Sequence, residues 1–403
     1  MNRFTQFIVI VLISLGLLEI VVRMNIEHPE TARTFWLSPL QLGIKLPPYP
    51  DPLTKLQDFL DRTSDSNDSL AIYDADLGYT YRPGYADPKT LMIHNSQSIR
   101  VGDITKEYSR KPDSNTLRIA IFGDSFSHGD GVAYTETWGH HLEMELRSQG
   151  IEAEVLNFGV GGYGMDQAFL RYLNQGVKFH PDLVIFGFSI ENTFRNLYLF
   201  RYFYKQGLTS IPLSKPRFLL KEDELHLINH PTPKPEEIPD ILRNFSGWQY
   251  GKYDRFYFED EYQKRFWHHL ESVTLLVAIY RRYRLSLLGD APNGEGYLLA
   301  QAIINAFAQS AIDNQSDFLI VHLPPKNHLP HYAKTGAFGY DEQLKTLESR
   351  YSVVRPEKQM LNAVQGGSID SLFGDVHFSR LGHMIIGEAA ARYIADDSSL
   401  SNH

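Results

Sequence analysis

Residues 117–126 read Leu-Arg-Ile-Ala-Ile-Phe-Gly-Asp-Ser-Phe, and this stretch decides the fold class. A compact apolar run that ends at a glycine is typical of a strand buried inside a parallel sheet. Ser125 stands on the turn that leaves this predicted strand. A serine on a sharp strand-to-helix turn is held above the sheet, and its backbone N–H can face a carbonyl oxygen. Ser125 is therefore a candidate nucleophile, and capping of the next helix is the alternative.

Further apolar runs of strand length follow, and segments with helical spacing separate them. The predicted strands cover 154–156, 183–186, 318–321 and 351–354, and the predicted helices cover 135–148, 300–312 and 383–393. Strands that alternate with helices predict an α/β fold with a three-layer, doubly wound parallel sheet. Sites in such sheets form outside the carboxyl ends of the strands. The alternation breaks down over about 196–287, which we interpret as an insertion containing a hairpin near 215–228.

The first residues of the chain differ in kind from the rest. Residues 4–22 are almost wholly apolar apart from Glu19, which approaches the ~20 residues that a helix needs to cross a bilayer. Arg3 precedes the run, which favours a cytoplasmic N-terminus and a catalytic domain outside. We therefore predict a membrane anchor over residues 1–25. A cleaved signal peptide and a buried core helix are the alternatives, and no small-x-small cleavage site follows the run.

Composition narrows the class of protein further. A formal net charge of −9 without a dense Lys/Arg block argues against nucleic-acid binding. The absence of cysteine excludes disulfides, thiolate zinc sites and cysteine nucleophiles. Residues 26–115 are polar and rich in proline and turns, and we interpret them as a stalk and lead-in that packs on a catalytic domain over 116–398.

A candidate base lies near the C-terminus, in the segment Gly-Asp-Val-His-Phe-Ser over residues 374–379. A hydroxyl needs a base to act as a nucleophile at neutral pH, and imidazole has a suitable pKa. His377 can supply that base, and Asp375 can hold its ring in one tautomer. A helix-capping Asp beside a surface His is the alternative interpretation of the pair.

Two other segments end predicted strands. Residues 157–164 contain four glycines, which allow the backbone to approach a ligand, so the Gly162 N–H is a candidate oxyanion donor. A tight turn is the alternative there. Asn192 follows the strand at 183–186 and could donate its side-chain amide to the same oxyanion, with an ordinary helix cap as the alternative.

Taken together and in this order, the four segments resemble the signature blocks of the SGNH (GDSL) hydrolase family. The resemblance covers residues 117 to about 393, apart from the insertion, and implies a flavodoxin-like fold. It implies Ser125 as nucleophile, Asp375 and His377 as the rest of a triad, and Ser125, Gly162 and Asn192 as the oxyanion hole. The family often has two residues between the Asp and the His, whereas this chain has only Val376.

The surrounding residues look like bacterial members with an N-terminal membrane helix, often associated with envelope or exported polysaccharide. The resemblance therefore implies a serine esterase that cleaves small O-acyl esters through an acyl-serine, with a glycan ester as a candidate substrate. It also implies a single-pass inner-membrane protein facing the periplasm or cell exterior, and needs no cofactor or metal. The alternatives are an O-acyltransferase with the same triad, and a non-catalytic scaffold or glycan-binding subunit. The sequence does not identify a protein partner.

Several histidines and aromatic residues invite functional interpretations that we do not adopt. His128, His140, His141, His268 and His269 match no common zinc spacing. His128 is expected to pack, although it lies three residues after Ser125. His322 either lines the pocket or marks a turn. The aromatic residues over 248–258 could stack on sugars, but core packing is the expectation.

Overall fold

The computed structural model describes residues 3–27, 33–37, 42–64, 69–113, 115–206, 209–263, 265–288, 294–365 and 367–397. The chain divides into two compact units. Unit 1 comprises Met1–Asp65, Tyr198–Ser214 and Pro235–Leu288, and unit 2 comprises Ser66–Leu197, Lys215–Lys234 and Gly289–His403. The predicted insertion over 196–287 is thus divided between them, because its hairpin belongs to unit 2.

Unit 2 is built on a five-stranded sheet of order β14-β13-β10-β8-β9, in which every neighbouring pair is parallel. This order confirms the predicted doubly wound α/β fold. Each residue of β8 and β10 is buried, as expected for strands covered on both faces. The bounds are β8 Leu117–Phe122, β9 Ala153–Asn157, β10 Leu183–Phe188, β13 Asp317–His322 and β14 Ser352–Val354.

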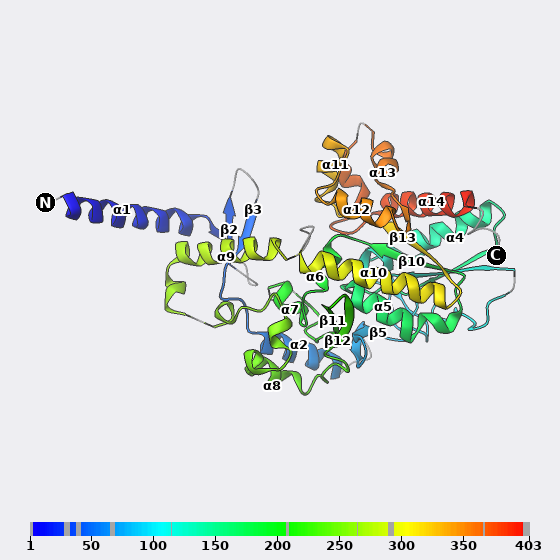
Figure 1. Cartoon of the computed structure of the whole chain (residues 1–403), viewed down its shortest axis with the longest axis horizontal. Coiled ribbons are helices and arrows are strands. Elements are labelled where there is room, and N and C mark those ends of the chain that lie inside the picture. The colour runs from blue at the N-terminus through cyan, green and yellow to red at the C-terminus, as the bar shows by residue number, and fades with distance from the viewer. Residues whose placement is uncertain are drawn as a thin grey trace. The chain divides into compact units, whose positions relative to one another are not determined.

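Helices cover both faces of this sheet (Figure 1). α4 and α14 pack together on one face, and α5 and α10 lie on the other. The predicted helices are confirmed with small shifts at their ends. The bounds are α3 Ser125–His128, α4 Trp138–Ser148, α5 Met165–Asn174, α6 Glu191–Arg195, α10 Glu295–Asp313, α11 Leu329–Thr335, α12 Asp341–Glu348, α13 Glu357–Ala363 and α14 Arg380–Asp396.

Short hairpins complete unit 2. One of them, β4–β5, packs on the glycine-rich loop after β9. The Tyr79 hydroxyl donates to Gly161 O at 3.0 Å, and the Tyr81 hydroxyl accepts from Gly161 N at 2.9 Å. This part of the lead-in therefore supports the site. The bounds are β4 Ala71–Asp74, β5 Gly78–Tyr81, β6 Ala86–Asp87, β7 Met92–Ile93, β11 Arg217–Lys221 and β12 Glu224–Ile228, the last pair being the predicted hairpin.

Unit 1 contains, in its described residues, α1, a sheet of three short strands and four further α-helices. α1 is the one helix in the described residues that is long and apolar enough to cross a membrane. Helix α2 occupies residues that we expected to form a stalk, because Leu56 and Phe59 recur on one face and are buried. The polar run from Asp65 lies outside the described residues. The bounds are α1 Arg3–Met24, β1 Ile26–Glu27, β2 Thr34–Leu37, β3 Leu42–Lys45, α2 Pro52–Ser64, α7 Arg201–Tyr204, α8 Ile238–Arg243 and α9 Glu271–Ser286.

Candidate active site

Ser125 is the first residue of α3, directly after the carboxyl end of β8, an interior strand of the sheet. The turn that holds it depends on Gly123, whose φ is +152°, and a methyl group there would lie 2.2 Å from Ser127 Oγ. Asp124 caps α3 by accepting the Phe126 N–H at 2.9 Å. Ser125 is consequently fixed at the edge of the sheet where sites form in this fold.

His377 reaches Ser125 from the other end of the chain. Its Nε2 lies 3.0 Å from Ser125 Oγ, within hydrogen-bonding distance. The ring also packs against Phe126, with centroids 5.3 Å apart. The loop that carries it is closed by the Gly374 N–H, which donates to His377 O at 3.0 Å. This is the arrangement in which a histidine can take the proton of a serine hydroxyl.

Asp375 makes a looser contact with the histidine than a buried triad carboxylate would. Its Oδ1 lies 3.5 Å from His377 Nδ1, and its side chain is 77% exposed. The same oxygen accepts the backbone N–H of His377 at 2.9 Å. That hydrogen bond holds the pKa of Asp375 below its usual value. The single residue between Asp375 and His377 leaves the carboxylate directed at the backbone of its own loop.

This geometry predicts a small effect for Asp375→Asn. An exposed ion pair is worth about 0.2–1 kcal/mol, which corresponds to roughly a 1.4–5-fold decrease in kcat. Asparagine can also keep the backbone hydrogen bonds of the loop. Steady-state hydrolysis of an activated acetyl ester measures this, with His377→Ala as the reference for a lost base. A decrease near the roughly 10⁴-fold loss known for a buried triad Asp would contradict it.

The two other predicted oxyanion residues follow β9 and β10, one on a loop and one in the short helix α6. Gly162 follows β9 and has a φ of +84°, in the left-handed region that favours glycine. Nearby, a methyl group on Gly159 would lie 2.5 Å from the His128 N atom, so this loop runs directly against α3. Asn192 lies in α6 and is 1% exposed, and its Oδ1 has no hydrogen-bond partner among the described residues.

Arg195 is a residue that the sequence analysis missed. Its Nη1 lies 2.7 Å from Asp124 Oδ2 and 3.1 Å from the carbonyl oxygen of Tyr163. Arg195 is itself on α6 with Asn192. One guanidinium therefore joins the turn of Ser125, the loop of Gly162 and the helix of Asn192. Burial raises the pKa of Asp124, and the neighbouring positive charge of Arg195 opposes that rise.

His128 and His94 form a buried cluster behind Ser125. His128 Nδ1 lies 2.5 Å from Asp130 Oδ1, and its Nε2 lies 2.9 Å from His94 Nε2. Burial lowers the pKa of His128 to about 4, so the ring is neutral at neutral pH. Both rings pack against Tyr81, which supports the expected packing role.

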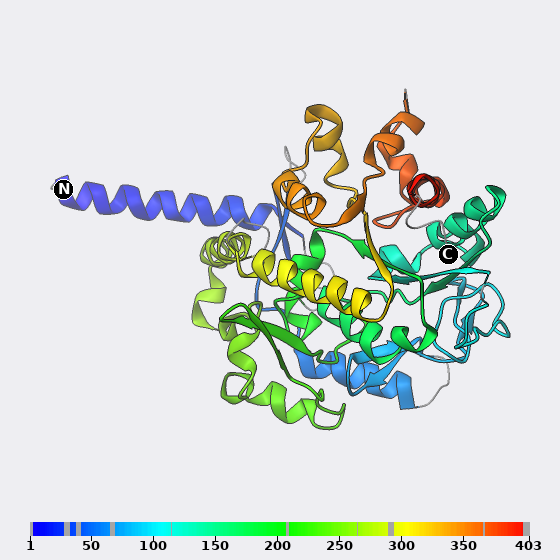
Figure 2. The same ribbon diagram turned by 45° about the vertical axis from the view of Figure 1, so that its right-hand side comes forward.

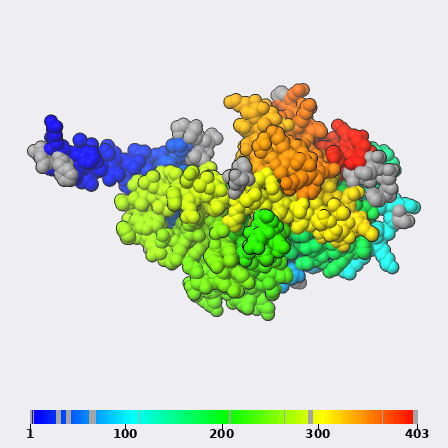
Figure 3. Space-filling model, viewed as in Figure 1, coloured from blue at the N-terminus to red at the C-terminus, as the bar shows by residue number. Residues whose placement is uncertain are grey.

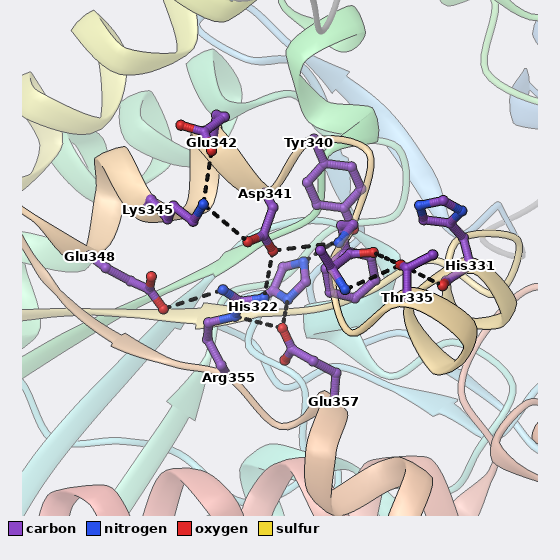
Figure 4. Close-up of polar contacts among 12 residues, drawn as sticks. His322, His331, Thr335, Tyr340, Asp341, Glu342, Lys345, Glu348, Arg355 and Glu357 are labelled. Carbon is purple, nitrogen blue, oxygen red and sulfur yellow. Dashed lines mark hydrogen bonds and ion pairs between the residues drawn. The ribbon is translucent and has the colours of Figure 1, made fainter.

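His322 is also an interior residue, not a pocket residue. Its Nδ1 lies 3.2 Å from Glu357 Oε1 and its Nε2 lies 3.3 Å from the Tyr340 hydroxyl. Arg355 bonds to the same carboxylate of Glu357 at 2.6 Å, and Figure 4 shows this network around the end of β13. Within the described part of the chain, no group of three or more His, Asp or Glu side chains is arranged to hold a metal ion.

Comparisons with known proteins give distant structural likenesses only. No family model and no curated protein matches the chain. A lipolytic protein of the G-D-S-L family from Desulfitobacterium hafniense is similar at 13% identity and a TM-score of 0.33, covering 69% of this chain and 99% of that one.

Two further solved structures are comparably distant. An acetylxylan esterase from Geobacillus stearothermophilus is similar at 12% identity and a TM-score of 0.36, over 69% of this chain and 93% of that one. A lipase/acylhydrolase from Enterococcus faecalis is similar at 12% and 0.35, over 69% and 95%.

Proposed function

We propose that the chain is a membrane-anchored serine esterase that cleaves small O-acyl esters. The observation that carries this proposal is the 3.0 Å contact between His377 Nε2 and Ser125 Oγ at the carboxyl edge of the sheet. Ser125 is 7% exposed, and the nearby Asn192 is 1% exposed. Because these two side chains are nearly buried, we infer that the acyl group of the substrate is small, such as acetyl. A glycan ester is the proposed natural substrate, on the sequence resemblance alone.

The reaction proceeds in two steps. His377 Nε2 accepts the hydroxyl proton while Ser125 Oγ attacks the ester carbonyl carbon. The resulting oxyanion receives hydrogen bonds from the backbone N–H groups of Ser125 and Gly162 and from the Asn192 amide. The C–O bond to the alcohol then breaks, and His377 returns the proton to the departing oxygen. Water attacks the acyl-serine in the same way and releases the acid.

The N-terminal helix defines the proposed location. Thr5–Met24 is long enough to span a bilayer, and Arg3 precedes it. We infer a single-pass protein of a bacterial inner membrane, with Ser125 facing the periplasm or the cell exterior.

Labelling with a membrane-impermeant fluorophosphonate tests two things together: whether Ser125 is an activated nucleophile, and on which side of the membrane it lies. Spheroplasts that produce the full chain should be labelled at Ser125, located by peptide mass, because this reagent captures only an activated serine. Ser125→Ala should abolish the label, and His377→Ala should slow labelling strongly.

The other outcomes separate the alternatives. Labelling only after lysis would place the active site in the cytoplasm, against the proposed topology. No labelling before or after lysis would favour a scaffold or glycan-binding subunit. In a separate assay with an activated acetyl ester, rapid transfer of the acetyl group to an added sugar instead of to water would favour an O-acyltransferase.

A further inference from the structure

Helix α9 presents an uncovered apolar stripe on the surface of unit 1. The stripe consists of Leu276, Ile279, Tyr280, Tyr283 and Leu287, which are between 45% and 61% exposed. The last four follow Leu276 by 3, 4, 7 and 11 residues, with Leu287 at the C-cap, so all five lie on one face of the helix. The opposite face is buried, through Leu275 and Ala278 among others. An apolar face of this kind marks an interaction surface.

The start of α9 is fixed to the end of α1. The Glu19 carboxylate accepts the backbone N–H groups of Glu271 and Ser272, both at 2.9 Å. It therefore caps α9 from another helix, where the helix dipole favours a negative charge. Arg23 lies 2.7 Å from Glu19 and donates to the carbonyl oxygen of His269 at 2.6 Å. Glu19, the one acidic residue of the predicted anchor, thus stabilises the start of α9.

Apolar packing strengthens this junction. Val22 of α1 is 2% exposed and shares a small core with Leu275, Ala278 and Leu46. Because polar and apolar contacts both hold the junction, α9 stays at the level of the last turns of α1. The stripe consequently lies where a spanning α1 leaves the bilayer.

The direction of α9 suits a surface helix. In Figure 2, α1 lies along the page while α9, beside its base, is seen nearly end-on, so α9 runs across α1. In Figure 3, α1 is a thin rod, and the yellow-green surface next to its base includes α9. If α1 runs through the bilayer, a helix that crosses it at this level lies along the membrane plane.

The chemistry of the stripe also matches a lipid headgroup layer. Two of its five members are tyrosines, which favour the boundary between water and hydrocarbon. Arg284 is exposed at its flank, where it can reach lipid phosphates. Just before α9, Phe266 is 87% exposed and adds apolar surface near the start of this helix.

We propose that α9 lies in the headgroup layer of the membrane that α1 spans, with the stripe turned into the lipid. This inference rests on the proposed anchoring by α1. Unit 1 would then be held at the membrane through a two-helix junction instead of through α1 alone.

Site-directed fluorescence can test the proposal in the full chain, which has no native cysteine. Single Cys variants at Leu276 and Tyr283 carry an environment-sensitive fluorophore, in vesicles of phosphatidylethanolamine and phosphatidylglycerol. Lipids with a nitroxide near the headgroup should quench both labels by roughly half, since an interfacial helix lies about 5–10 Å into the boundary layer. A label at Arg282, on the same helix but off the stripe, is the matched control and should be quenched less.

A label at Leu12, in the middle of α1, reports on the anchor separately. Quenching at Leu12 by nitroxides deep in the bilayer, without quenching at Leu276 and Tyr283, would overturn the inference and leave the anchor standing. The same Cys variants, left unlabelled and treated with a mild oxidant, report on contacts between copies. Disulfide formation between copies there, without lipid quenching of the labelled variants, would also overturn the inference in favour of a second copy. Absence of quenching at Leu12 would contradict both the membrane anchor and the inference that rests on it. Fluorophosphonate labelling of Ser125 would still test the esterase activity independently.

Discussion

Replacing Ser125 with alanine should lower kcat for a small activated acetyl ester by about 10⁴-fold or more, as expected when a nucleophile and its base act as one unit. The reason is that alanine leaves His377 with no hydroxyl to deprotonate, so no acyl-enzyme can form. The oxyanion donors remain and sustain only a weak residual rate. Stopped-time assays of the full chain in detergent, at equal concentration of folded protein, measure the effect.

Ser127→Ala is the matched control for that substitution. Ser127 lies in the same short helix, is fully buried, and its hydroxyl has no hydrogen-bond partner among the described residues. Removing that hydroxyl should therefore leave kcat and stability nearly unchanged. If Ser125→Ala retained most of the activity while Ser127→Ala also did, another residue would be the nucleophile. A large loss in both variants would indicate damage to the turn instead.

Replacing Arg195 with methionine should lower the free energy of unfolding by about 3–5 kcal/mol, the usual cost of leaving one partner of a buried pair without its counter-charge. Asp124 is fully buried and Arg195 is 3% exposed, so water cannot replace the lost guanidinium. The loss should also release the carbonyl oxygen of Tyr163 from its hydrogen bond. Denaturant unfolding, followed by tryptophan fluorescence in detergent, measures the change.

A double-substitution cycle gives this prediction its control. Asp124→Asn with Arg195→Met removes both charges, and asparagine can still cap α3. The double variant should recover much of the stability lost in Arg195→Met, giving a coupling energy well above zero. Equal losses in the single and double variants would show that Arg195 acts through packing and not through the ion pair.

The sheet could be predicted from sequence because its strands carry a local pattern. β8, β9, β10, β13 and β14 are short apolar runs between segments with helical spacing, and both signals depend on neighbouring residues only. The loops that end β8, β9 and β10 were recognised for a similar reason. Their glycines occupy turns such as those at Gly123 and Gly162, where positive φ is required.

Other features could not be read from local patterns. The 3.5 Å separation and high exposure of Asp375 follow from how its loop closes, whereas the sequence shows only an Asp near a His. In the sequence, nothing distinguishes Arg195 from other helical residues. Its role becomes visible only in the folded chain, where it pairs with Asp124, 71 positions earlier. Helix α2 lies in a segment that the sequence indicates as a stalk, because prolines precede its short run of apolar spacing.

The contrast is clearest in the N-terminal helix α1. The length and apolar composition of residues 4–22 already identify a helix suited to a bilayer, because burial in lipid depends on the segment alone. The capping of α9 by Glu19 joins residues 252 positions apart, and it exists because packing brings a carboxylate to unpaired N–H groups. Sequence patterns thus established the elements and the residue types at their ends. Long-range packing established which side chains are buried, paired or uncovered, since those properties depend on neighbours that only folding supplies.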